Sequence, residues 1–303
     1  MIVYWAKFEL ATSIFYPVIL YIIVSALFYI SLFCKIIGYS ILMISDLQVI
    51  ILAAGKGKRF NLPHTSKVMV HLNGIPLLAH LLKTLQETHI CDKPVLVVGH
   101  AAESIRDFFG SRYFYVEQKE LLGTGHAVSC CKPYLPITTQ NVLVMYGDTP
   151  FIKTDSLTQL LQTHFQTKAV LTLATTQLGP FDGWKSVFFD WGRIVRNAGG
   201  KVKKIVEKKD ASAQELAITE INAAFYCFDN QWLWESLPKL SNNNAQQEYY
   251  LTDLVEIAVS QNQPIADIQI HPEEAVGINT VEHLEIANKI FLKATSPNYL
   301  ETY

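Results

Sequence analysis

The residues with the clearest chemical potential lie in a short turn after the apolar run at 48–52. The turn reads Ala53-Ala54-Gly55-Lys56-Gly57-Lys58-Arg59. Gly55 and Gly57 leave backbone N–H groups uncovered, so an anion can approach the main chain closely. No Asp or Glu occurs between Leu47 and Gln86. The cations in the same window are Lys56, Lys58, Arg59, Lys67 and Lys83. This acid-free, basic stretch predicts a phosphate site, and a bound triphosphate would account for all of its features.

Two familiar phosphate loops do not match this turn. A Walker loop needs the pattern GxxxxGK[ST], whereas the sequence here is GKGKRFNLP. A dinucleotide-binding fingerprint needs a third glycine where Phe60 stands and an acidic residue about 20 positions later. Both are missing, which argues against NAD binding. Because a lone GxG is also typical of an ordinary turn, the neighbouring cations carry the prediction.

A carboxylate follows a second apolar run, NVLVM at 141–145. The next residues are Tyr146-Gly147-Asp148-Thr149-Pro150. Open α/β sheets bind ligands at the carboxyl ends of their parallel strands. Since Mg²⁺ prefers few carboxylates together with waters and phosphate oxygens, we predict that Asp148 is a magnesium ligand. The alternative is an aspartate that only caps a turn or helix.

Other polar stretches are too specific for an ordinary surface, although each one alone is also typical of a turn or cap. They are Gln118–Val128, Glu220–Asn222, Ser241–Asp253 and Gly277–Asn279. We interpret His126 as a packed or capping residue rather than a catalytic base. A set of lysines is interpreted as a solvated face: Lys201, Lys203, Lys204, Lys208 and Lys209.

The elements that must position these residues alternate between strands and helices in the first half of the chain. Nearly continuous apolar runs at 48–52, 94–98, 113–117 and 141–145 predict buried parallel strands. The stretch 76–87 has a leucine stripe at helical spacing and begins at Pro76, which predicts a crossover helix with proline at its first position. The first half is therefore predicted to be an α/β doubly wound sheet.

The second half is predicted to add β-ribbon insertions to the same sheet, because its apolar runs are joined by short Gly or Asn connections. The predicted strands are 169–176, 186–190, 192–196, 202–207 and 218–228. Helices are expected near 247–260 and 280–292.

Composition excludes several classes of protein. The net charge of −2 provides no broad basic surface, so no nucleic-acid partner is expected. The 5 cysteines form no CxxC pair and the 9 histidines form no HExxH motif, which gives no support to a disulfide framework or a zinc hydrolase. A reducing compartment is expected.

The N-terminal region differs from the rest of the chain. Residues 10–34 carry no charged side chain and are long enough to span a bilayer as a helix. Lys7 and Lys35 flank this segment almost symmetrically and leave its orientation open. The alternative is that residues 1–42 precede the true start, since Met43 stands just before the first predicted strand. We therefore predict a hydrophobic extension at 1–42 and a catalytic domain at 43–303.

Taken together, the motifs resemble a known family, the uridylyltransferase domain of the bacterial bifunctional N-acetylglucosamine-1-phosphate uridylyltransferase and glucosamine-1-phosphate acetyltransferase. The resemblance runs from about Leu47 to about Ile290. It rests on LAAGKGKRF, KVMVHLNGIPLL, LLGTGHAV, VLVMYGDTP, GRIVR, IVEKKDAS, EINAAFY, NNNAQQEYYLTD and GIN, in that order. The family implies an α/β, Rossmann-like (GT-A-like) nucleotidyltransferase fold with three layers, a mixed and mostly parallel sheet, and β-ribbon insertions. No hexapeptide repeats follow Asn279, so no acetyltransferase β-helix is expected in this sequence.

The resemblance also implies roles for individual residues. The implied catalytic residues, which would contact the triphosphate, are Arg59 and Lys67. The implied nucleotide-binding residues are Leu52, Ala53, Ala54, Gly55, Gly57, Gln118, Gly123 and Thr124. Gln118 would read uracil, because one amide can both donate and accept a hydrogen bond. The implied sugar-binding residues are Tyr146, Gly192, Glu207, Asn222, Tyr250 and Thr252. The implied Mg²⁺ ligands are Asp148 and Asn279.

Several positions depart from the family pattern. Lys58 replaces a usual threonine, Ser66 replaces a proline, and one extra residue separates Arg59 from Lys67. Ala224 stands where a glycine is usual, and the segment before Gly192 is longer than the usual turn. The first three departures imply a reshaped phosphate loop, whereas the last two concern the identity of the sugar more than the reaction.

The resemblance implies a reaction in which UTP and an N-acetylhexosamine 1-phosphate, with N-acetylglucosamine 1-phosphate expected, form a UDP-sugar and pyrophosphate for nucleotide-sugar and cell-envelope synthesis. One alternative is an enzyme of the same fold that uses another sugar phosphate or a thymidylyl or cytidylyl donor. Another is a membrane-tethered, non-catalytic nucleotide-sugar binding protein. The expected location is cytoplasmic, with inner-membrane tethering through 10–34 as an open alternative. Nothing in the sequence points to an oligomeric state.

Overall fold

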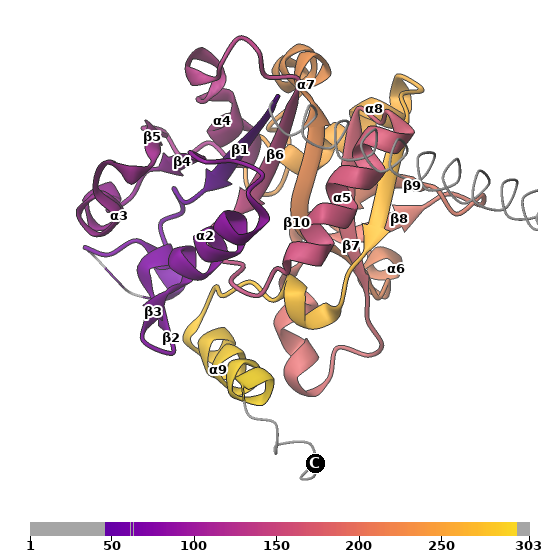
Figure 1. The fold of residues 1–303 in the computed structure, drawn as a ribbon. Coiled ribbons are helices and arrows are strands. Elements are labelled where there is room, and N and C mark those ends of the chain that lie inside the picture. Colours follow the sequence, from indigo (N-terminus) through magenta and orange to yellow (C-terminus); the bar gives the residue numbers. More distant parts are fainter. Residues whose placement is uncertain (1–45, 61, 63, 296–303) are drawn as a thin grey trace, which may run out of the picture. The chain divides into compact units, whose positions relative to one another are not determined.

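The computed structural model describes residues 46–60, 62 and 64–295 (Figure 1). The chain divides into two units, Met1–Ser45 and Asp46–Tyr303. The predicted extension at 1–42, with its apolar segment at 10–34, lies outside the described residues.

The predicted parallel strands form half of the central sheet. They are β1 (Leu47–Leu52), β4 (Val95–Val98), β5 (Phe114–Glu117) and β6 (Asn141–Tyr146). Strand β1 is buried along its whole length because it pairs in parallel with β4 on one side and β6 on the other. Its last residue, Leu52, is in register with Tyr146 of β6. The loops that leave β1 and β6 therefore emerge side by side.

The second half of the sheet contains β7 (Leu171–Gln177), β10 (Glu220–Asp229) and β11 (Ile265–Gln269). Within the described residues the strand order is β11-β7-β10-β6-β1-β4-β5. Strand β10 runs antiparallel to both neighbours, β6 and β7, while β11 pairs in parallel with β7. The sheet is thus mixed but mostly parallel, as predicted.

Two smaller β features extend this core. Strands β8 (Arg193–Arg196) and β9 (Val202–Val206) form an antiparallel ribbon that joins the sheet where β8 pairs with β10. This ribbon confirms the predicted insertion. A separate two-stranded sheet consists of β2 (His71–Leu72) and β3 (Ile75–Pro76).

Helices cover both faces of the sheet, which gives three layers (Figure 1). Helices α2 (Leu77–Thr88) and α5 (Thr154–Thr167) contact each other and lie in front of the sheet in this view. Helices α4 (Thr124–Ser129), α7 (Asn230–Ser236) and α8 (Leu254–Ser260) pack into one core against the other face. The remaining helices are α3 (Ala102–Phe109), α6 (Ala213–Leu216) and α9 (Val281–Thr295).

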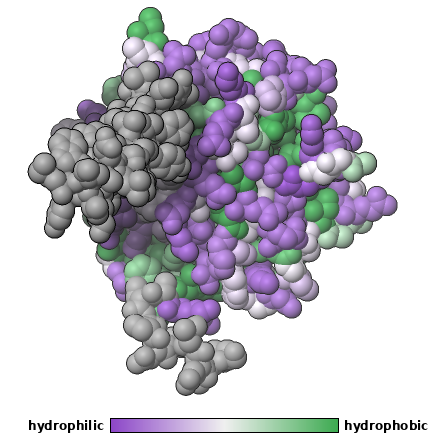
Figure 2. All heavy atoms as spheres, turned by 45° about the vertical axis from the view of Figure 1, so that its right-hand side comes forward, coloured by the Kyte–Doolittle hydropathy of each residue, from purple (hydrophilic) through white to green (hydrophobic). Residues whose placement is uncertain are grey.

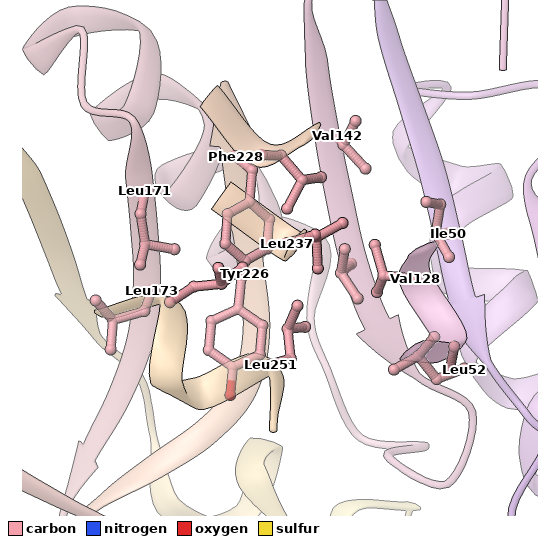
Figure 3. Close-up of a cluster of buried hydrophobic side chains, with 14 of the residues drawn as sticks. Ile50, Leu52, Val128, Val142, Leu171, Leu173, Tyr226, Phe228, Leu237 and Leu251 are labelled. Atoms are coloured by element: carbon pink, nitrogen blue, oxygen red, sulfur yellow. The ribbon is translucent and has the colours of Figure 1, made fainter. Parts of the chain in front are cut away.

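Alternation along the strands determines which face each apolar side chain enters. Ile50 and Leu52 of β1 point into the same core as Val128 of α4 and Leu251, while Tyr226 and Phe228 extend this core along β10 (Figure 3). Figure 3 shows these side chains pointing toward one another from β1, β10, α4 and the turn at Leu251. The core thus fixes α4 and the Leu251 turn relative to the end of β1.

One predicted strand is wrong. Residues 186–190 belong to a 3₁₀ helix, Gly183–Asp190. The rings of Trp184 and Phe188 meet edge to face with centroids 5.9 Å apart, whereas residues four apart in a strand are separated by about 13 Å. Aromatic packing within the segment therefore favours a helical turn over an extended run.

Two predicted helix boundaries also differ. Pro76 precedes α2 as its N-cap residue instead of occupying its first position. The stretch predicted as one helix at 247–260 begins later, with a 3₁₀ turn at Leu251–Asp253 followed by α8. Residues before Leu251 line the cleft described below.

Hydrophilic residues dominate the face shown in Figure 2, where hydrophobic residues form small separate groups. Among the described residues, none of the helices has the length and apolar character needed to cross a membrane.

Candidate active site

A cleft of about 1080 Å³ opens beside the carboxyl ends of β1, β5 and β6. The start of β10 borders it as well, because β10 runs in the opposite direction and carries an irregularity between Asn222 and Tyr226. Parallel strands bring distant loops to one edge of a sheet, which is where α/β proteins bind ligands.

The cleft brings together nearly all residues that the sequence predicted. Those lining it are Leu52, Ala53, Ala54, Gly55, Gly57, Arg59, Lys67, Gln118, Gly123, Thr124, Tyr146, Asp148, Gly192, Glu207, Asn222, Tyr250 and Asn279. Thr252 is the exception. It is buried behind the cleft wall, where its hydroxyl donates to Glu207 Oε1 at 3.1 Å.

The loop after β1 forms the cationic end of the cleft. Gly55 has open space around it, so a ligand can reach its backbone. Gly57 has a φ of +56°, and a side chain there would meet Lys67 at 3.0 Å. The guanidinium of Arg59 is largely exposed and lies 3.4 Å from Asp190 Oδ2. This end is suited to a polyanion.

Lys67, Asp148 and Asn279 meet at one point although they are far apart in the chain. Lys67 Nζ donates to Asp148 Oδ2 and, at 2.7 Å, to Asn279 Oδ1. The backbone holds this arrangement, because Ile278 N donates to the carbonyl oxygen of Asp148 at 3.0 Å. The carboxylate oxygen of Asp148 and the amide oxygen of Asn279 therefore both face one cation, the Lys67 ammonium.

This donor set fits magnesium. One carboxylate and one amide oxygen leave room for waters and phosphate oxygens, which Mg²⁺ prefers. Within the described residues there is no cluster of three or more His, Cys, Asp or Glu side chains that would suit another metal. Asp148 and Asn279 are thus the residues that would hold the ion.

Another part of the cleft wall is formed by Gln118, after β5, and by Gly123 at the start of α4. Gln118 Nε2 donates to the carbonyl oxygen of Gly123 at 3.0 Å and also lies 3.1 Å from His126 Nδ1. A side chain on Gly123 would approach the backbone of Tyr249 at 2.7 Å, so only glycine fits there. Thr124 Oγ1 accepts from Leu251 N at 2.9 Å and ties α4 to the turn before α8.

A third group of residues forms a polar pocket beside the β8–β9 ribbon. Burial raises the pKa of the Glu207 carboxyl, although the hydrogen bond from Thr252 acts in the opposite direction. Asn222 is buried, and its side-chain oxygen accepts from Ala224 N at 3.1 Å. Ala224 lines the cleft with a φ of +62°, a conformation in which the family's usual glycine would be unstrained.

Two tyrosines border this pocket. Burial raises the pKa of Tyr146, and burial also raises the pKa of Tyr250 to about 12. Tyr250 OH donates to Asp210 Oδ2 at 3.3 Å. Both phenols are therefore protonated near neutral pH and available for hydrogen bonding.

The structure adds cleft residues that sequence reasoning missed. Asp190 and Trp191 reach the cleft because the long segment before Gly192 folds back over it. Asp190 pairs with both Arg59 and Lys208, and the hydrogen bond from Lys208 lowers the pKa of Asp190. Lys208 and Lys209, which the sequence placed on a solvated face, also line the cleft, and Lys209 is exposed to solvent as well. They follow β9, whose end returns to the cleft, and no periodicity could have shown this.

His126 was predicted to be a packed or capping residue. Its ring packs against the cleft wall, where Nδ1 lies 3.1 Å from Nε2 of Gln118.

Comparisons with known proteins agree with this geometry. Residues 49–246 match the model of the MobA-like NTP transferase domain. The chain is 40% identical over 245 residues to "Bifunctional protein GlmU" of Acetivibrio thermocellus, covering 80% of this chain and 51% of that protein. It is 42% identical over 242 residues to "Bifunctional protein GlmU" of Geobacillus sp., again with 80% and 51% coverage. The chain thus spans about half the length of the curated relatives it matches.

A solved structure shows the same fold. It is UDP-glucose pyrophosphorylase complexed with UDP-glucose, with a TM-score of 0.62 and 21% identity, and the match covers 81% of this chain and 98% of that one. Fold, cleft and family match therefore agree, and the chain belongs to the family of MobA-like NTP transferase domains.

Proposed function

We propose that this protein transfers the uridylyl group of UTP to N-acetylglucosamine 1-phosphate, forming UDP-N-acetylglucosamine and pyrophosphate. The observation that carries the proposal is a single cleft that joins a cationic loop, the Lys67–Asp148–Asn279 cluster and a polar pocket. The similarity to GlmU proteins supports the uridylyl donor and the N-acetylglucosamine acceptor.

The reaction needs one bond to form and one to break. An oxygen of the sugar phosphate attacks the α-phosphorus of UTP. The bond from the α-phosphorus to the bridging β oxygen breaks, and pyrophosphate leaves with the electron pair. No general base is needed, because a phosphate monoester is already a competent nucleophile near neutral pH.

The main obstacle is repulsion between two anions, and the cleft residues are placed to reduce it. Arg59 and the backbone amides around Gly55 would bind the β- and γ-phosphates, which become the leaving group. Lys67, which is adjacent to Asp148, would neutralise charge at the α-phosphate. Magnesium bound by Asp148 and Asn279 would supply further positive charge to the phosphate oxygens.

Orientation is the second contribution. Gln118, Gly123 and Thr124 would hold the base, while Tyr146, Gly192, Glu207, Asn222 and Tyr250 would hold the sugar, with Thr252 fixing Glu207. Binding of the base and of the sugar in one cleft would hold the two phosphates close to each other, which replaces a bimolecular encounter by an oriented one.

The test is a matrix of substrates with the purified chain and Mg²⁺. UTP, dTTP and CTP are each combined with N-acetylglucosamine, N-acetylgalactosamine and glucose 1-phosphates, and product and pyrophosphate are quantified. We expect the highest kcat/KM for UTP with N-acetylglucosamine 1-phosphate. A higher value for another pair would identify a different enzyme of the same fold. Nucleotide-sugar binding without turnover of any pair would favour a binding protein.

A further inference from the structure

The Gln118 amide has only one orientation that its neighbours allow. Its Nε2 lies 3.0 Å from the carbonyl oxygen of Gly123, and a carbonyl can only accept hydrogen bonds. The amide NH₂ must therefore face Gly123. The same nitrogen lies 3.1 Å from His126 Nδ1, so the two hydrogens of the NH₂ group are directed to these two acceptors.

This geometry also fixes the state of the imidazole. His126 Nδ1 can accept from Gln118 only if it carries no proton, so the ring proton must be on Nε2. His126 Nε2 lies 4.0 Å from Cys130 Sγ, on the side of the ring away from the amide. The imidazole acts as an acceptor toward Gln118.

The remaining polar atom of the amide is Oε1. The contacts of the Gln118 amide with Gly123 and with His126 both go through Nε2 and leave Oε1 as the atom that can face a ligand. Gln118 is only 4% exposed, yet it lines the cleft. The contact that Gln118 presents to a ligand is therefore an acceptor alone, not the donor–acceptor pair expected from the sequence.

An acceptor at this position distinguishes uracil from cytosine. Uracil carries an N3–H that can donate to Oε1, while cytosine has an unprotonated N3 whose lone pair would face the oxygen. A buried polar atom left without a partner costs more than the net gain of one hydrogen bond. An amide turned the other way would reverse the preference.

We propose that His126 is a positioning residue for base selection: by accepting from Gln118 Nε2, it holds Oε1 toward the base and favours uracil over cytosine. The inference rests on the proposed function, because it assumes that the base of the nucleotide binds at Gln118. His126 itself does not contact the base in this arrangement.

The experiment uses a matched pair of amide variants. In His126→Asn the side-chain oxygen can occupy the position of Nδ1, whereas in His126→Gln the longer side chain carries its oxygen toward the former Nε2. His126→Phe keeps a ring but removes both nitrogens. The readout is the ratio of the dissociation constants of UTP and CTP, measured by calorimetry without sugar phosphate, with kcat/KM ratios as a second measurement.

We expect His126→Asn to keep the wild-type preference for UTP within about twofold. His126→Gln and His126→Phe should reduce it by about tenfold, the equivalent of about 1.4 kcal/mol for one lost hydrogen bond. Gln118→Ala should also reduce it, and the double variant Gln118→Ala/His126→Phe should be no worse than Gln118→Ala alone, because the histidine acts through the amide.

Two outcomes in the histidine variants would overturn the inference. One is an unchanged preference in both His126→Gln and His126→Phe while Gln118→Ala loses it; the other is an equal loss in all three histidine variants. If Gln118→Ala leaves UTP binding unchanged, the base binds elsewhere and the inference fails as well. Failure of the proposed function is seen separately, as wild-type protein that binds UTP selectively but forms no product.

Discussion

At the scale of single residues, the centre of the site is the group formed by the Lys67 ammonium, the Asp148 carboxylate and the Asn279 amide. The Asp148 side chain is 11% exposed and the Lys67 side chain 17%. Because both charges are largely removed from water, each depends on the other for compensation. A ligand that draws Lys67 toward a phosphate would leave the oxygens of Asp148 and Asn279 to a metal ion.

This arrangement predicts a strong effect of Asp148→Asn. The amide cannot provide the negative charge that holds a divalent cation, so kcat/KM should fall at least about 100-fold, in the range seen for lost electrostatic stabilisation. The melting temperature should also fall, because the largely buried Lys67 loses its charged partner, although the carbonyl of residue 148 still accepts from Ile278 N and keeps the backbone in place. Product formation in 1 to 10 mM Mg²⁺ and a thermal melt provide the two measurements. The control is Asp107→Asn, on the exposed side of α3, and wild-type turnover in Asp148→Asn would refute the metal role.

At the scale of elements, the cleft depends on how tightly the start of α4 docks against the chain before α8. Gly125 N donates to Tyr249 O and Tyr249 N donates to Leu122 O, both at 2.8 Å. Gly123 lies between these bonds with φ 106° and ψ 178°. Glycine alone adopts this conformation readily.

Two glycine variants can separate backbone strain from steric contact. Gly110 ends α3 with φ 61° and ψ −142° and has open space where a Cβ would be, whereas a Cβ on Gly123 would meet Tyr249 N and O at 2.7 Å. Gly110→Ala should therefore cost about 1–3 kcal/mol from the backbone alone. Gly123→Ala should cost about 1–3 kcal/mol more and weaken UTP binding. Urea unfolding gives the free energy of unfolding of both variants. Equal losses would show that contact of the added Cβ with Tyr249 does not affect stability.

Element boundaries show where local sequence was sufficient. Continuous apolar runs identified β1, β4, β5 and β6, because a strand buried on both faces needs no alternation. The run at 186–190 has the same composition, but its aromatic rings pack against one another and form a 3₁₀ helix. Composition does not distinguish these outcomes when the partners of a segment are unknown.

At the scale of the whole molecule, one buried histidine links stability to pH. His164 of α5 is 2% exposed and contacts Thr172 of β7 and Asn141 of β6. Burial lowers the pKa of His164 from 6.5 to about 4. The unfolded chain therefore binds a proton before the folded chain does, and stability falls as the pH drops from about 6.5 to about 4. Over this pH range the free energy of unfolding falls by about 3 kcal/mol.

His164→Gln tests this linkage. At pH 7 the variant should be less stable than wild type by about 1–2 kcal/mol, because packing and hydrogen bonds are disturbed. Between pH 6.5 and 4 the difference should shrink and then reverse, changing by up to about 3 kcal/mol in total, since the variant has no group to protonate at this position. Burial raises the pKa of Asp253 to about 6, with the opposite effect on stability, but both proteins contain it. Urea unfolding at several pH values gives the difference, and a constant difference would contradict the linkage.

The division of the chain at Asp46 leads to a last prediction. The cleft residues, from Leu52 to His283, belong to the unit Asp46–Tyr303. A chain shortened to residues 43–303 should therefore fold and keep kcat within about twofold of the full chain, since it contains every core and cleft residue that the structure describes. Circular dichroism and the uridylyltransferase assay test this. An unfolded or inactive product would show that residues 1–42 are needed by the domain.

The sequence by itself determined the alternation of strands and helices, the glycine loop with its cations, and Asp148 at a strand end. These features depend on residue types close together in the chain. The resemblance to a family added Asn279, Glu207 and Thr252, which no local pattern identifies. Only the tertiary structure decided that Lys67 lies between Asp148 and Asn279, that Asp190 and Lys208 enter the cleft, and that the Gln118 amide nitrogen faces Gly123 and His126. Each of these depends on contacts between segments that the sheet brings together, and such contacts leave no periodic signal in the sequence.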